Sequence, residues 1–247
     1  MSIKKIGPII VLFIGLIFLL LINYFFYCYF IGDKEISPEA QLHVDKEAIY
    51  DFGVQNEELV YDFHIGNSDF VMSDKQYGLE IIVFDDPSGP FAPEYYQTLK
   101  MIDNEYDEAK IALRLLPLAS HDYSRQASLA VLCAGEQGKF FEAYEAVLDL
   151  NIQKQVNIDS IKSKTSVLVD DLESYNNCLV SSTSIAALEK WEEQADDNAV
   201  IGTPSTFIAN TPYPGAYQLD DFVDTACLER EGLYTIINEK LRMKNVE

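Results

Sequence analysis

The side chains of this chain that could carry out thiol, metal or acid–base chemistry are few, and most lie far apart. Four cysteines and three histidines occur in 247 residues, at Cys28, Cys133, Cys178, Cys227, His43, His64 and His121. No histidine has zinc-ligand spacing to another histidine or to a cysteine pair. Gly-x-Ser-x-Gly and glycine-rich phosphate-binding motifs are absent from the sequence. We therefore expect neither a metal site nor a cofactor.

Two adjacent carboxylates, Asp85 and Asp86, stand between an apolar run and a segment with helical spacing. Adjacent side chains on extended backbone point to opposite sides. The two carboxylates are therefore not expected to act as an acid/base pair, and we interpret them as turn and helix-capping residues.

The segment from residue 59 has the pattern of a strand–helix–strand unit. Apolar, β-branched runs at Leu79–Phe84 and Ile111–Leu116 are typical of strands that are buried on both faces. Helical spacing at Pro93–Tyr106 lies between them, so the two strands are expected to pair in parallel. An extended segment, Leu59–Ile65, and a turn, Gly66–Asp69, precede this unit.

The second half of the chain begins with residues 123–199, which are helical in pattern almost throughout. A strand at Ser205–Ala209, a Pro/Gly turn at Thr211–Gly215 and an amphipathic helix at Leu219–Arg242 follow. The expected fold class is α/β, in a domain that spans residues 59–247 and carries its helical insertion at 123–199.

Five short stretches, in this order, resemble motifs of the DsbA-like branch of the thioredoxin superfamily. They are FDDPSGPFA at 84–92, Leu116-Pro117-Leu118 followed by His121, CAGEQGKFF at 133–141, GTPSTF at 202–207, and Pro214-Gly215-Ala216. The first is similar to the family's active-site turn, in which Phe-x-Asp and two more residues precede Cys-Pro-Tyr/Phe-Cys. The resemblance extends over residues 60–240 and implies a thioredoxin-like fold with a helical insertion.

The chain departs from this family at the residues that carry out its chemistry. The two cysteine positions hold Gly89 and Ala92, with Pro90 and Phe91 between them. A thiol oxidoreductase needs its first cysteine at a helix N-terminus, where the macrodipole and backbone amides stabilise the thiolate. The turn has neither an attacking nor a resolving thiol, so the comparison implies a degenerate site without catalytic residues.

No shift in the alignment restores the motif, because no cysteine lies between Cys28 and Cys133. The buried acidic residue that the family often has six positions before its first cysteine is replaced by Val83. We therefore expect this turn to have no redox activity.

The peptide-binding half of the family's site is retained in the sequence. The resemblance implies a cis peptide bond at Pro204, which leaves the backbone of Thr203 free to pair with an extended peptide beside Phe91. The expected ligand is an extended or unfolded polypeptide. The alternative is that Pro204 is kept only because the fold needs this turn.

The remaining cysteines allow a second interpretation. Some relatives carry a non-catalytic disulfide in the helical region, which implies a structural Cys133–Cys178 bond here; two buried free thiols are the alternative. Cys227 would then be unpaired. A rival function is a thiol-disulfide oxidoreductase that uses a non-standard pair, Cys133 with Cys178 or with Cys227, although neither pair has the family's setting at a helix N-terminus.

The N-terminal segment predicts a membrane anchor. Residues 6–31 carry no charge and can cross a hydrocarbon core of roughly 30 Å. Lys4 and Lys5 precede this run and acidic residues follow it, so the positive-inside rule places residues 1–5 in the cytoplasm and the rest outside. We expect a single-pass signal anchor, then an acidic tether at 32–58. The resemblance implies a bacterial envelope.

The charge of the external part excludes one class of partner. After residue 31 the chain has 40 acidic and 16 basic residues, a formal charge of −24. Nucleic-acid binding requires Lys and Arg to neutralise phosphates, so it is not expected. The sequence thus predicts an anchored, non-enzymatic module, chaperone-like or scaffolding. An envelope protein that fills the degenerate groove as part of a larger complex is a further possible partner.

Overall fold

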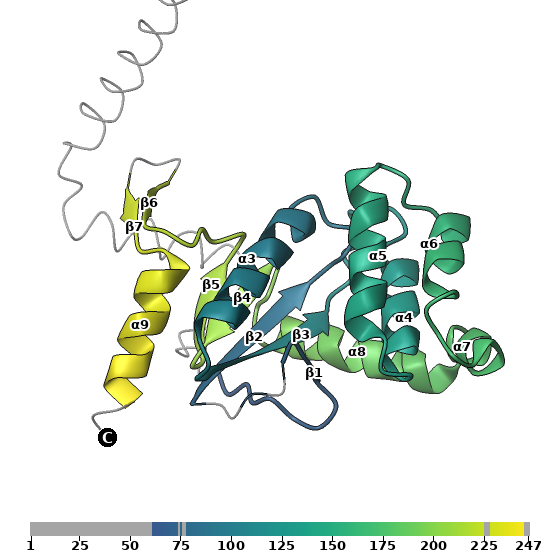
Figure 1. Cartoon of the computed structure of the whole chain (residues 1–247), viewed down its shortest axis with the longest axis horizontal. Coiled ribbons are helices and arrows are strands. Elements are labelled where there is room, and N and C mark those ends of the chain that lie inside the picture. The colour runs from purple at the N-terminus through teal and green to yellow at the C-terminus, as the bar shows by residue number, and fades with distance from the viewer. Residues whose placement is uncertain (1–60, 74, 76–77, 225–227, 245–247) are drawn as a thin grey trace, which may run out of the picture. The chain divides into compact units, whose positions relative to one another are not determined.

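The computed structural model describes residues 61–73, 75, 78–224 and 228–244 (Figure 1). Among these residues no helix is both long and apolar enough to cross a membrane. The predicted anchor at 6–31, the tether at 32–58, and Cys28 and Cys227 lie outside the described residues.

The chain divides into two compact units. The larger comprises Leu59–Asp220 and Gly232–Glu247. The smaller includes Asp221–Glu231, in which strand β6 (Phe222–Val223) pairs antiparallel with β7 (Glu229–Arg230). The residues that the sequence singles out for function belong to the larger unit wherever they are described.

The larger unit is built around a mixed sheet with the strand order β1-β3-β2-β4-β5 (Figure 1). The strands are β1 (Phe70–Val71), β2 (Leu79–Asp85), β3 (Ala109–Leu115), β4 (Ser205–Ile208) and β5 (Thr211–Pro214). β2 and β3 run parallel, with Ile81 opposite Ile111, and the other neighbours are antiparallel. Helix α3 (Ala92–Glu105) connects the parallel pair, as the strand–helix–strand pattern predicts.

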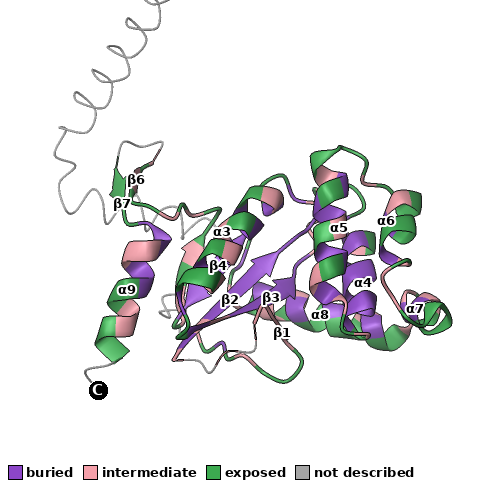
Figure 2. Ribbon diagram, in the orientation of Figure 1, coloured by how far each residue is buried: buried purple, intermediate pink, exposed green. Residues whose placement is uncertain are grey.

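The central strands β2 and β3 are buried on both faces (Figure 2). On one face, Ile81 and Val83 belong to a large core shared with α3, the helical insertion and the last helix. On the other face, Ile82 and Phe84 belong to a smaller core that Phe63 closes. This two-sided burial explains why both strands are continuous apolar runs in the sequence.

Five helices follow β3, in the region where helical spacing predicts them. They are α4 (Ser124–Gly135), α5 (Phe140–Ile152), α6 (Ile158–Thr165), α7 (Leu172–Cys178) and α8 (Ser182–Asp197). Cys133 of α4 and Cys178 of α7 form a disulfide with a Cα–Cα distance of 5.7 Å. Both cysteines are buried. The disulfide, and not a pair of free thiols, is therefore confirmed.

The extended segment before β1 is fastened to the sheet by a buried ion pair. Arg114 of β3 donates to both carboxylate oxygens of Asp69, from Nε at 2.8 Å and from Nη2 at 2.9 Å, and Nη2 also donates to the carbonyl of His64. The guanidinium lies over the rings of Phe63 and Phe84. Arg114 thus holds the segment before β1 by hydrogen bonds and an ion pair, and it packs on two aromatic rings of the smaller core.

The last helix is shorter than the sequence pattern predicts. The spacing predicts a helix at Leu219–Arg242, whereas α9 spans Leu233–Lys244. At Gly232 the chain returns so close to Asp220 that an added Cβ would lie 2.2 Å from the Asp220 carbonyl carbon. A continuous helix cannot bring residues twelve positions apart into contact, because each residue adds about 1.5 Å along its axis. The apolar spacing before residue 232 therefore does not indicate a helix.

Candidate functional site

The turn between β2 and α3 is held rigidly by side chains on both sides of it. The Asp86 carboxylate accepts hydrogen bonds from the backbone N–H and the hydroxyl of Ser88, at 2.9 and 2.7 Å. From α5, the Asn151 amide donates to the carbonyls of Pro87 and Gly89, at 3.1 and 2.7 Å. The turn is thus fixed at both its start and its end.

Helix α3 begins directly after this turn, and the two positions that the sequence resemblance aligns with the family's cysteines, Gly89 and Ala92, are at its start. Ala92 is its first residue and is buried, as is Gly89. An added Cβ at Gly89 would lie 3.3 Å from Cε1 of the His121 imidazole. Phe91, at the N-cap position, makes no side-chain capping bond. The helix start therefore carries backbone amides but no thiol.

Asp86 lies at the centre of a buried hydrogen-bond network. Besides Ser88, its carboxylate accepts from Nδ1 of His121 at 2.8 Å, from the hydroxyl of Ser124 at 2.5 Å and from the backbone N–H of Leu118 at 3.3 Å. This confirms that Asp86 stabilises the turn. The role of His121 was not predicted, because its partner lies 35 positions away in the sequence.

Asp85 points to the opposite face, as adjacent side chains on a strand must. The prediction that Asp85 and Asp86 cap the helix is wrong for both, because the N-cap residue of α3 is Phe91 and no side chain makes a capping bond there. Its side chain accepts hydrogen bonds from the hydroxyl of Tyr144 in α5, at 2.5 Å, and from the Asp86 backbone N–H. Burial raises the pKa of Asp85 to about 7, although these bonds oppose the shift. Burial, and next the Asp85 charge, raises the pKa of Tyr144 well above its usual value, so its hydroxyl remains a donor.

A buried acid beneath the turn is therefore present, contrary to the expectation from Val83. Side chains two positions apart on a strand share one face, so Asp85 projects on the same side as Val83. The period-two pattern could have suggested this substitute. The burial that raises its pKa could not be anticipated, because it depends on α5.

The titration of Asp85 is expected to make the fold less stable as the pH rises. Its folded-state pKa exceeds the unfolded one, so the native state holds the proton more tightly and stability falls between the two pKa values. Between pH 5 and pH 8 the wild type should lose about 2–3 kcal/mol relative to an Asp85→Asn variant, since one pKa unit corresponds to about 1.4 kcal/mol. Urea unfolding at both pH values measures the loss; equal losses in the two proteins would contradict it.

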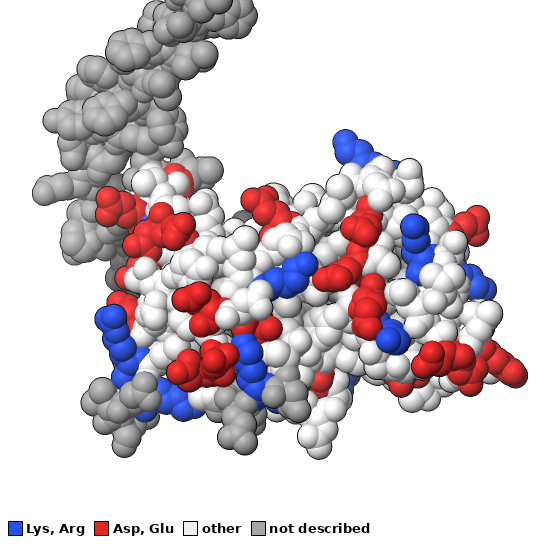
Figure 3. Space-filling model, viewed as in Figure 1, with Lys and Arg blue, Asp and Glu red and all other residues white. Residues whose placement is uncertain are grey.

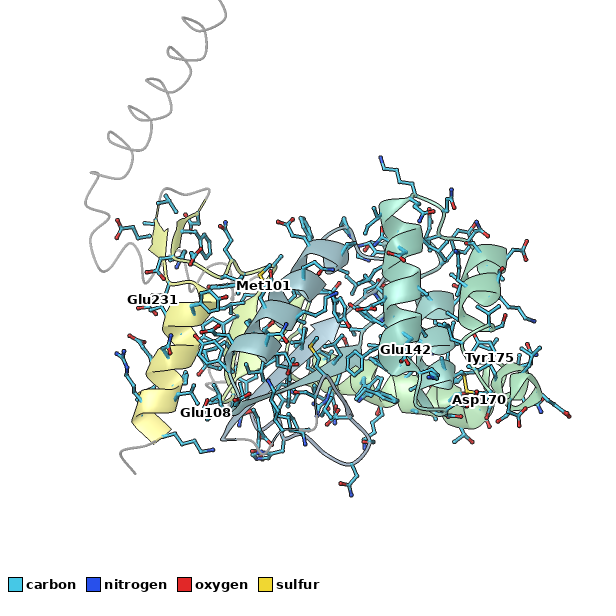
Figure 4. The ribbon with its side chains drawn as sticks, in the orientation of Figure 1. Met101, Glu108, Glu142, Asp170, Tyr175 and Glu231 are labelled. Carbon is cyan, nitrogen blue, oxygen red and sulfur yellow. A yellow bond between two sulfur atoms is a disulfide. The ribbon has the colours of Figure 1, made fainter. Side chains whose placement is uncertain are left out.

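A groove of about 810 Å³ runs between α3 and the segment 215–220. Phe91 and Met101 line it and expose 57% and 52% of their surface, and Tyr217 and Leu219 add apolar wall. Figure 4 shows Met101 on the side of α3 that this groove occupies. Its volume falls within the range of about 300–1,000 Å³ that is typical of ligand sites.

Thr203 lies on the groove with unused hydrogen-bonding groups. Within the described part of the chain, neither its backbone N–H nor its C=O has a hydrogen-bond partner, and its buried hydroxyl oxygen also has none. The Thr203–Pro204 peptide bond is cis. The structure thus brings Phe91 and Thr203 to one groove. Pro204 does not line it, and instead lines a cavity of about 290 Å³ behind the same loop.

The other residues with chemical potential lie outside this groove. Cys133 and Cys178 are 1% and 7% exposed and do not line it. Among the described residues no cluster of three His, Cys, Asp or Glu side chains could hold a metal ion.

A parallel βαβ unit, a helical block before two antiparallel strands, and a cis-proline loop beside the start of the first helix together define the thioredoxin fold. The sequence model of the thioredoxin family matches residues 68–225, more than half of the chain. The chain belongs to this family.

Solved structures with the same fold include DsbA-like and ScsC-like proteins, which confirms the resemblance drawn from the motifs. The catalytic domain of Proteus mirabilis ScsC is 22% identical, with a TM-score of 0.55 over 72% of this chain and 91% of that one. Wolbachia pipientis α-DsbA1 is 14% identical, with a TM-score of 0.58 over 74% of this chain and 96% of that one. At these identities the likeness concerns the fold.

A curated relative is matched over only a small part of its length. The chain is 22% identical over 153 residues to the Na(+)/H(+) antiporter NhaA 1 of Salinispora arenicola. The match covers 62% of this chain but only 23% of that protein. The similarity therefore concerns a part of the antiporter.

Proposed function

We propose that this protein is a membrane-anchored, extracytoplasmic thioredoxin-fold module that binds extended polypeptide without disulfide chemistry. The observation that carries the proposal is the contrast at the start of α3. Gly89 and Ala92 occupy the positions where thiols would react, while Phe91 and Thr203 still line an open groove. In this proposal residues 6–31 hold the domain at the membrane, and its role is chaperone-like or that of a scaffold.

Binding follows from the unused groups of Thr203. The backbone N–H and C=O of Thr203 can pair with an extended chain in the manner of an added strand. Such backbone pairing contributes affinity that depends little on the sequence of the peptide. Phe91 offers an apolar contact to a side chain of that peptide. The Cys133–Cys178 bond does not favour the rival oxidoreductase, because both sulfurs are buried and distant in sequence from the turn.

The full chain should bind a carboxymethylated, permanently unfolded polypeptide, which has no free thiol. Phe91→Ala is expected to weaken binding about five- to tenfold, because it removes roughly 1 kcal/mol of apolar contact. Fluorescence anisotropy of the labelled polypeptide measures the affinity. Val180→Ala is the matched control, since Val180 is also exposed but lies outside the groove.

Dithiol oxidation and disulfide reduction are measured on the same preparations. No turnover is expected from the full chain. Turnover that disappears in a Cys133→Ala variant would contradict the proposal, because it would show that a non-standard cysteine performs the chemistry. Absence of binding to any unfolded polypeptide would contradict it as well.

A further inference from the structure

The groove beside Thr203 has acidic as well as apolar chemistry. Glu94, in the first turn of α3, and Asp220, at the end of the segment 215–220, both line it. No Lys or Arg lines it, and neither carboxylate has an ion pair among the described residues. The groove therefore presents two uncompensated negative charges next to the exposed Phe91 and Met101.

Two other acidic residues of α3 and α5, outside the groove, do have cationic partners. Asp103 pairs with Lys75, and Glu145 pairs with Lys100 at 3.3 Å. Figure 3 shows Asp and Glu side chains spread over the face that includes α3 and α5. A concave site within such a surface concentrates negative potential, and it attracts cations more strongly than a flat one.

The position of Thr203 determines how a ligand would meet these charges. A chain that pairs with its backbone is extended, so every second side chain faces the groove. When an apolar side chain of the peptide packs on Phe91 or Met101, the peptide side chains two positions before and after it also face the groove. A Lys or Arg there can lay its aliphatic stem on the apolar wall and extend its charge to Glu94 or Asp220.

We infer that this groove selects extended peptide segments in which Lys or Arg stands two positions from a large apolar residue. The inference rests on the proposed function, because it names the ligand class of the same groove. Three features support it together: the apolar wall, the free backbone groups of Thr203 and the two unpaired carboxylates.

Three fluorescent peptides of one length test the inference on the full chain. Each alternates Phe with one variable residue type on the same side, which is Lys, Gln or Glu. At low salt the Lys peptide should bind about three- to tenfold more tightly than the Gln peptide, and the Glu peptide most weakly. The difference should shrink at high salt, because exposed charges are screened.

Paired variants separate the groove from the overall charge. Glu94→Gln with Asp220→Asn should lower the affinity for the Lys peptide to that for the Gln peptide and leave the Gln peptide unaffected. Asp170→Asn with Glu173→Gln removes the same charge outside the groove and should change neither affinity. Equal losses in both double variants would overturn the inference, since net charge alone would then attract the peptide.

The possible failures are distinguishable. If Lys and Gln peptides bind equally well, the charge selection is wrong and peptide binding stands. If none of the three peptides binds, the proposed function itself fails.

Discussion

Replacing Gly89 and Ala92 together with cysteine is expected to create a redox-active disulfide at the start of α3. The fold already provides the helix N-terminus, the buried Asp85 carboxyl beneath the turn and the His121 imidazole beside position 89. In this setting the pKa of the first thiol should fall from about 8.5 to below about 7.5. After reduction to its dithiol form, the double variant should reduce a protein disulfide at least about tenfold faster than the wild type, because its first thiol is largely ionised at neutral pH and the wild type has no thiol at this turn.

The measurement is disulfide reduction by the full chain, with the thiol pKa read from the pH dependence of iodoacetamide labelling. The wild type corrects for its own cysteines. Gly89→Cys alone is the matched control, because it has the attacking thiol without the resolving one. An added Cβ at Gly89 would also lie 3.0 Å from the Asp86 carbonyl oxygen, so the turn must adjust slightly. A folded double variant without this disulfide would show that the turn, and not only its thiols, has lost the redox geometry.

Breaking the Asp69–Arg114 pair is expected to cause the largest loss of stability from a single substitution. Both side chains are about 95% buried or more, so Asp69→Asn or Arg114→Met leaves a lone buried charge or unmet donors beside the smaller core. Each should lower the free energy of unfolding by about 3–5 kcal/mol. Urea unfolding, followed by the fluorescence of the single buried Trp191, measures the change.

The double variant distinguishes a buried pair from two independent contacts. Asp69→Asn combined with Arg114→Met removes both charges, so it should cost clearly less than the sum of the single losses. As a control, Lys139→Met breaks the half-exposed Lys139–Glu142 pair and should cost at most about 1 kcal/mol. Additive losses in the first pair would mean that its two charges are not coupled.

The strands β2 and β3 and the helix α3 could be predicted from the sequence because their signals are local. Two fully buried strands are continuous apolar runs, and the structure places them at Leu79–Asp85 and Ala109–Leu115, within two residues of the prediction. The predicted last helix failed for the opposite reason. Its N-terminal boundary depends on the approach of Gly232 to Asp220, a contact that apolar spacing does not encode.

For the turn between β2 and α3 as well, some features could be predicted from the sequence and others could not. That Gly89 and Ala92 provide no thiol follows from residue identity alone, and no tertiary contact can supply the missing sulfurs. The Asp85–Tyr144 and Asp86–His121 contacts join residues 59 and 35 positions apart. The largest cause of the raised pKa of Asp85 is burial by other elements, so residue 85 by itself could not reveal it.

The sequence by itself therefore determined the fold family, through short motifs in a fixed order, and the absence of thiols from the turn, through the residues at positions 89 and 92. Only the tertiary structure decided that Glu94 and Asp220 line the groove that the resemblance predicts at Phe91 and Thr203. The physical reason is that the walls of this groove come from segments more than 100 residues apart in the sequence. Its shape, its unpaired backbone groups and its charge exist only after those segments have packed.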